Sequence, residues 1–220
     1  MTAVVTDLLL EAAEWRLLGL LFEYPGESWR RQLERLAPDL RREPMRQLAD
    51  SALETATPGL HLALFGPGGT VPIREAAHQG GVQLGYLMAE IAAYYEAFAY
   101  QPAAGEPEDH LAVEAGFIAF LRMKEAIAVD ACEADAAEVV RDAAAAFVRD
   151  HLAVLAEPVA RALETYGPEY LVEAGGILLE RTGRPARSSY PLGSPLTDDE
   201  ETGHFGCGAG PGGSELVRLT

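Results

Sequence analysis

The sequence predicts an all-α protein, a single-domain helical bundle of about 8–10 helices followed by a flexible C-terminal tail. Apolar residues recur at helical spacing in one segment after another, and proline or glycine separates these segments. β-branched residues are few and never alternate with polar ones over the length of a strand. The chain has 220 residues, of which 49% are hydrophobic, so it can bury a sizeable core.

The first helix is the clearest of the predicted elements. Leu9, Leu17 and Leu20 share a helical face, Thr6 or Asp7 can cap the start, and Tyr24-Pro25-Gly26 ends the run. Residues 66–81 contain too many glycines and prolines for regular structure and predict a loop with at most one short turn. Further helices are expected at about 28–37, 43–57, 58–65, 82–99, 107–129, 135–156, 159–166 and 168–182.

The composition changes after Gly183. From there glycine, proline, serine and acidic residues replace the apolar residues that would offset the entropy of ordering the chain. We therefore expect a helical domain at 1–182 and a flexible, low-complexity tail at 183–220.

Charge and cysteine content limit the partners and the compartment. The formal net charge of −17 disfavours nucleic acid and favours basic ligands, including peptides that carry arginine. Two cysteines without a Cys-x-x-Cys spacing predict no disulfide framework. No secretory signal is recognisable, and no run approaches the ~18 apolar residues that a membrane span needs. These observations predict a cytoplasmic protein without a membrane span.

The stretch GEPEDHLAVE, residues 105–114, has the form of a helix start. Pro107 fits the first helical position, and Glu108 and Asp109 would then lie in the first turn, near the positive end of the helix dipole. A charged His110 would be unfavourable there, so we expect it to be neutral and hydrogen-bonded to Asp109 or to a neighbouring segment. Asp150-His151-Leu152-Ala153-Val154 repeats the Asp-His-Leu-Ala-Val of this stretch.

A metal-dependent helical-bundle enzyme is the alternative that uses these acidic residues and histidines. Glu75 and His78 match the Glu-x-x-His unit of di-iron bundles, and Glu106, His110 and Glu114 share a helical spacing. Such a site, however, needs that unit twice and two further inward glutamates, and Glu75 falls in the predicted loop. The sequence contains no phosphate-binding loop and no convincing catalytic nucleophile.

Aromatic and apolar residues on the predicted helix at 82–99 and just beyond it suggest a surface for a peptide. They occupy more than one face of the helix, so some should line a groove or reach water. The set is Tyr86, Met88, Tyr94, Tyr95, Phe98 and Tyr100.

Several motifs in a fixed order resemble the TorD/DmsD/NarJ family of redox-enzyme maturation chaperones, over roughly residues 8–182. They are Leu64-Phe65-Gly66-Pro67, a proline-containing loop, Tyr94-Tyr95-Glu96-Ala97-Phe98, Glu106-Pro107-Glu108-Asp109-His110-Leu111, and Phe147 to Leu152.

The resemblance implies a system-specific chaperone with no catalytic activity, cofactor or metal of its own. It would bind the twin-arginine signal peptide and the apo catalytic subunit of a molybdopterin oxidoreductase until cofactor insertion is complete. It would act as a monomer or a domain-swapped dimer. The residues implied in signal-peptide and client binding are Leu64, Phe65, Pro72, Glu106, Pro107, Asp109 and His110.

Overall fold

The computed structural model describes residues 2–79, 84–102 and 105–185, and in these residues it contains helices and no strand. The expected all-α fold is therefore confirmed. Short 3₁₀ turns lie at Ala37–Asp39 and Glu75–Ala77, and a π-helical turn lies at Val148–Leu152. The helices are α1 (Ala3–Leu21), α2 (Glu27–Leu36), α3 (Glu43–Thr55), α4 (Pro58–Phe65), α5 (Leu84–Ala97), α6 (Leu111–Asp130), α7 (Ala134–Phe147), α8 (Ala153–Tyr166) and α9 (Glu169–Thr182).

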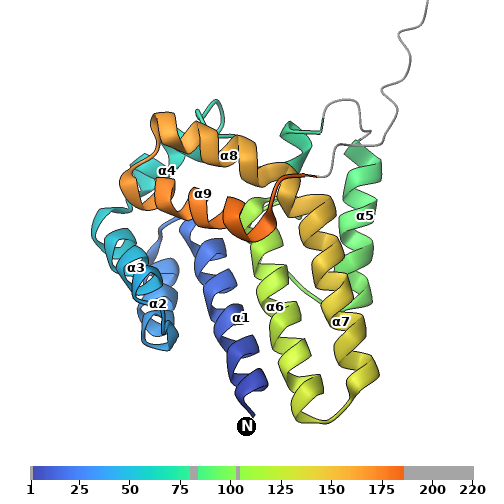
Figure 1. Cartoon of the computed structure of the whole chain (residues 1–220). Helices are drawn as coiled ribbons and strands as arrows, with labels where there is room; N and C mark the ends of the chain where they lie inside the picture. The colour runs from blue at the N-terminus through green and yellow to red at the C-terminus, as the bar shows by residue number, and fades with distance from the viewer. Residues whose placement is uncertain (1, 80–83, 103–104, 186–220) are drawn as a thin grey trace, which may run out of the picture. The chain divides into compact units, whose positions relative to one another are not determined.

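α1 and α6 form the central pair and run antiparallel, side by side (Figure 1). Gly19 permits this close approach, because a Cβ at that position would lie 3.0 Å from the carbonyl oxygen of Ala112. The pair buries Leu17, Leu18 and Phe117 completely. Such burial of large apolar side chains is the main force that holds the helices together.

The remaining helices pack around this pair. α7 packs along α6, and α9 packs on α8 and also contacts α1 and α3 (Figure 1). α5 packs against α6 and α7 through aromatic rings. The ring centroids of Tyr95 and Phe117 lie 4.9 Å apart, and those of Tyr94 and Phe147 lie 5.2 Å apart. In the described part of the chain, no helix combines the length and apolarity that crossing a bilayer requires.

Two predicted helix boundaries are wrong. The helix expected at 107–129 begins only at Leu111, so Pro107 is not its first residue and Asp109 lies ahead of the first turn. The helix expected at 135–156 is interrupted at Val148–Leu152, and Pro158 lies inside α8 instead of separating two helices. Proline removes one backbone donor, but the surrounding packing holds the helix through it.

One further boundary differs from expectation, and one prediction is confirmed. α1 begins at Ala3, with the Thr2 hydroxyl accepting a hydrogen bond from the Val5 N–H, so Thr6 and Asp7 lie within the helix. The loop at 66–79 contains one 3₁₀ turn, as the sequence predicts. Most of the tail expected at 183–220 lies outside the described residues.

Candidate functional site

Asp109 holds the loop at residues 66–79, which we call the strap, against the start of α6. Asp109 is fully buried. One carboxylate oxygen accepts a hydrogen bond from Arg74 Nε at 2.9 Å and forms an ion pair with Arg74 Nη2 at 2.7 Å. The other oxygen accepts from the Ala76 N–H at 3.2 Å. Charge-assisted bonds of this kind are among the stronger polar contacts in proteins, so Asp109 fixes the position of the strap.

Backbone hydrogen bonds reinforce this attachment. The Glu75 N–H donates to the Asp109 carbonyl oxygen, and the Leu111 N–H donates to the Ile73 carbonyl oxygen, both at 2.9 Å. Tyr95 of α5 donates its hydroxyl proton to the carbonyl oxygen of Glu108 at 2.9 Å. The strap, α5 and the segment that leads into α6 therefore form one connected unit.

His110 is the N-cap of α6. Its Nδ1 accepts a hydrogen bond from the Ala112 N–H at 3.2 Å, which requires Nδ1 to carry no proton. The pKa of His110 is lowered to about 4, mainly by burial and also by the charges of His61 and Arg74, while Asp109 opposes the shift. The expectation of a neutral histidine agrees with this geometry. Its hydrogen-bond partner is the helix backbone, and its Nε2 lies 3.6 Å from Glu106 Oε2.

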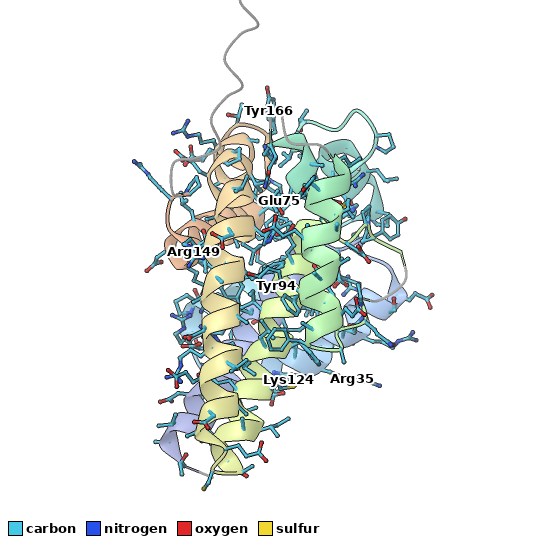
Figure 2. The ribbon with its side chains drawn as sticks, turned by 90° about the vertical axis from the view of Figure 1, so that its right-hand side faces the viewer. Arg35, Glu75, Tyr94, Lys124, Arg149 and Tyr166 are labelled. Carbon is cyan, nitrogen blue, oxygen red and sulfur yellow. The ribbon has the colours of Figure 1, made fainter. Side chains whose placement is uncertain are left out.

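A second buried polar cluster lies beside the first. Glu75, which is labelled in Figure 2, is fully buried. It accepts a hydrogen bond from His151 Nδ1 at 3.0 Å and another from the Gln79 amide. The His151 ring packs on Tyr94 at 5.7 Å. Burial, followed by the charges of Glu75 and Asp109, raises the pKa of Glu114 well above its ordinary value.

These groups do not form the metal site of the alternative hypothesis. His78 lies apart from the cluster, with its Nε2 2.9 Å from the Pro72 carbonyl oxygen, and Glu106 is half-buried near His110. Across residues 2–79, 84–102 and 105–185, no three histidine, cysteine or acidic side chains converge in a way that could hold a metal ion. The metal-dependent enzyme therefore has no support in this part of the chain.

The remaining residues expected at the site differ in accessibility. Leu64 is buried, and its carbonyl oxygen accepts from the Val71 N–H of the strap at 2.9 Å. Phe65 is half-buried, and its ring packs 5.1 Å from that of His61. Pro72 and Pro107 are exposed. The structure thus separates a buried frame of Leu64, Asp109 and His110 from side chains that a partner can reach.

The sequence did not reveal an apolar groove of about 360 Å³ between α1 and α6. Gly116 leaves space for the Tyr100 hydroxyl, because a Cβ at Gly116 would lie 2.8 Å from it. Of the aromatic set expected to form a peptide groove, Tyr100 alone lines this one. The lining residues are Leu9, Ala12, Ala13, Arg16, Leu36, Tyr100, Gly116, Ala119, Phe120 and Met123.

One end of this apolar groove adjoins acidic residues. Arg16 at the wall donates to Glu23 at 2.6 Å, so its charge is compensated. Burial and the charge of Glu23 raise the pKa of Glu106, and the Glu23 charge also acts on Tyr100 in the groove. Glu23 therefore lies beside the groove wall, and its charge acts on Glu106 in the segment that precedes α6.

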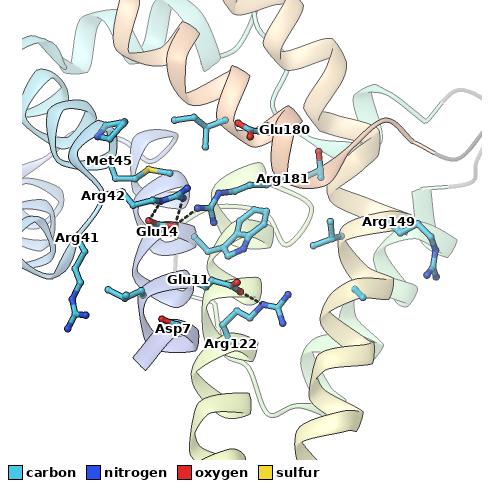
Figure 3. Close-up of a pocket in the computed structure, with 17 residues that line it drawn as sticks. Asp7, Glu11, Glu14, Arg41, Arg42, Met45, Arg122, Arg149, Glu180 and Arg181 are labelled. Carbon is cyan, nitrogen blue, oxygen red and sulfur yellow. Dashed lines mark hydrogen bonds and ion pairs between the residues drawn. The ribbon is translucent and has the colours of Figure 1, made fainter. Parts of the chain in front are cut away.

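A larger cleft of about 880 Å³ lies on the opposite side of α1, and its lining includes both acidic and basic side chains. Glu14 at its centre accepts hydrogen bonds from Arg42 and Arg181, and Arg181 lies 5.5 Å from the ring centroid of Trp15 (Figure 3). Arg122 pairs with Glu11 at 3.1 Å. The guanidinium groups at the wall of this cleft are thus paired with carboxylates, as Arg16 is beside the apolar groove.

A comparison with models of protein families identifies the family of this chain. The model of the nitrate reductase delta subunit family matches residues 29–160, which is more than half of the chain. No curated protein and no solved structure gave a match. The resemblance to redox-enzyme maturation chaperones is thereby confirmed. The chain belongs to the nitrate reductase delta subunit family, the NarJ/TorD-like chaperones that mature molybdoenzymes.

Proposed function

We propose that the protein is a cytoplasmic chaperone that binds a twin-arginine signal peptide, and with it the apo catalytic subunit of a molybdoenzyme, through the apolar groove between α1 and α6. The observation that carries this proposal is the apolar groove itself, in a chain of this family, with the Arg16 side chain of its wall paired to Glu23. A signal peptide has the matching order of charge and apolarity, with arginines ahead of an apolar run.

Burial of apolar surface is the main source of affinity in this scheme. The apolar run of the peptide would cover Leu9, Phe120 and Met123, which line the groove, and both surfaces would lose contact with water. The peptide arginines would face Glu23 and Glu106. Such pairs at a solvated rim contribute orientation and encounter rate more than affinity, and the net charge of −17 adds to the steering.

The residues expected at the site then have two roles. Asp109, His110 and Leu64 hold the strap and the start of α6 in place, because their side chains are buried. The side chains of Pro72 and Pro107 are exposed and would contact the client subunit beyond its signal peptide. Phe65 is accessible in part and would do the same. In this proposal the protein holds its client and performs no turnover.

The test is a titration of the full chain with a fluorescently labelled twin-arginine signal peptide of a molybdoenzyme. Met123 is 45% exposed and lines the groove, so Met123→Lys should weaken binding by about tenfold or more, since it puts a charge against the apolar run. Val139→Lys is the matched control, because Val139 is 61% exposed and does not line the groove. Absence of saturable binding to the unmodified protein, or equal loss in both variants, would contradict the proposal.

A further inference from the structure

The C-terminal end of the strap is attached mainly by buried polar groups. Val71 and Ile73 are its buried apolar side chains, whereas Glu75, at the first position of the 3₁₀ turn, inserts a carboxylate into the interior. Between them, Pro72 and Arg74 are exposed. A segment held in this way depends on whether its buried polar groups stay satisfied, because each unsatisfied one has a large cost.

Glu75 faces ionisable or polar groups from every element packed around it. His151 from the π-helical turn and Gln79 from the strap donate hydrogen bonds to its two oxygens. Glu114 of α6 is fully buried, and among the described residues neither of its oxygens has a donor directed at it. The other groups whose charges or hydroxyls act on this cluster are Arg74, Tyr94, Tyr95 and Asp109.

A single proton on Glu114 would give both carboxyl groups a hydrogen-bond partner. When Glu114 carries it, the carboxyl group becomes a donor and the Glu75 carboxylate accepts, so both groups are satisfied. When the proton is lost, two carboxylates remain close together in a buried site, and their repulsion adds to the cost of keeping either charge away from water. Glu114 is fixed in the middle of the core helix α6, whereas Glu75 belongs to a surface loop. We therefore expect the strap, and not α6, to move when the proton is lost.

We propose that the strap is a proton-dependent latch, closed while Glu75 and Glu114 share a proton and released when that proton is lost. Release withdraws Glu75 from His151, breaks the hold of Asp109 on Arg74, and uncovers Val71 and Ile73. The device is independent of the identity of the client, so it can be tested with the isolated protein. A failed peptide titration would not bear on it.

Trypsin reports the state of the latch directly. Arg74 is the only lysine or arginine between Arg46 and Arg122, so cleavage there divides the chain into two clearly separated fragments. In the closed state Arg74 is bound to Asp109 and its neighbours are hydrogen-bonded, which protects the bond from the protease. Cleavage after Arg41, which is exposed, measures protease activity at each pH.

The expected result is a rise of about tenfold or more in cleavage after Arg74, relative to cleavage after Arg41, as pH increases through the raised pKa of Glu114 into the alkaline range. Glu114→Gln keeps a neutral donor opposite Glu75, so this ratio should stay low throughout. Glu75→Ala removes the latch, so the ratio should be high at every pH, with the helical circular dichroism retained. A flat ratio in the unmodified protein, or the same rise in Glu114→Gln, would overturn the proposal. The Glu114→Gln comparison also decides the question if Glu75→Ala does not fold.

Discussion

Replacement of His110 by asparagine should make the fold less sensitive to acid. The His110 pKa is about 4 in the folded protein, against the ordinary value of 6.5, because the ring is buried. Asparagine is also a good N-cap, so His110→Asn preserves the bond to the α6 backbone while removing the titrating ring. The variant therefore separates the capping role of the residue from its charge.

The magnitude follows from the difference between the two pKa values. Below pH 6.5 the unfolded chain binds a proton at His110 that the folded protein does not, so the stabilising contribution is complete above pH 6.5 and falls as pH decreases toward 4. At about 1.4 kcal/mol per pH unit, the loss reaches about 3 kcal/mol. The Asn variant lacks this loss, whereas acid titration of the carboxylates affects both proteins.

The assay is urea unfolding followed by tryptophan fluorescence, since both Trp15 and Trp29 are buried. The free energy of unfolding is compared between the two proteins at about pH 7.5 and about pH 4.5, where most of the difference should have developed. If both lose the same stability between these pH values, His110 does not stay neutral in the folded state, and the N-cap geometry described above is refuted.

Three further predictions concern close packing and the buried carboxyl groups. Gly19→Ala should destabilise the protein by about 1–3 kcal/mol because its Cβ would meet the α6 backbone at 3.0 Å, whereas Gly176→Ala, with open space around it, should be neutral or stabilising by up to about 1 kcal/mol in thermal unfolding. Gly116→Ala should weaken peptide binding several-fold by displacing the Tyr100 hydroxyl, with little change in the unfolding midpoint; unchanged binding would exclude this end of the groove. Glu114→Gln should gain stability over the unmodified protein at alkaline pH. The raised pKa of Glu114 means that its stabilising effect is complete below its ordinary value of 4.5 and is lost as pH rises through the folded value; equal pH profiles in urea unfolding would contradict this.

Apolar periodicity predicted the helices well because it depends on local spacing alone. Their ends were less predictable. Pro107 and the acidic residues after it have the composition of a first helical turn, yet the chain uses Asp109 to bind Arg74, 35 residues earlier in the sequence. No local pattern records such a contact. The π-helical turn at Val148–Leu152 likewise places His151 opposite Glu75, and this pairing depends on the tertiary fold.

The apolar groove could not be predicted from the sequence for a related reason. Leu9 and Ala13 on α1, and Phe120 and Met123 on α6, have the helical spacing of core residues. Only the approach of the two helices at Gly19 and Gly116 decides which of these side chains are covered. A pattern of apolar residues therefore could not distinguish the wall of the groove from the core.

The placement of Asp109 and His110 changes how this motif relates to binding. Neither side chain lines the apolar groove, and both are buried, so they can affect a ligand only through the segments that they hold. Substitution of Asp109 would release Arg74 and the strap, and substitution of His110 would alter the start of α6, which also provides Gly116 to the groove floor. A loss of binding in either variant is thus expected even without direct contact. The variant Met123→Lys changes an exposed side chain that lines the groove itself, so it is the more decisive test of where the peptide lies.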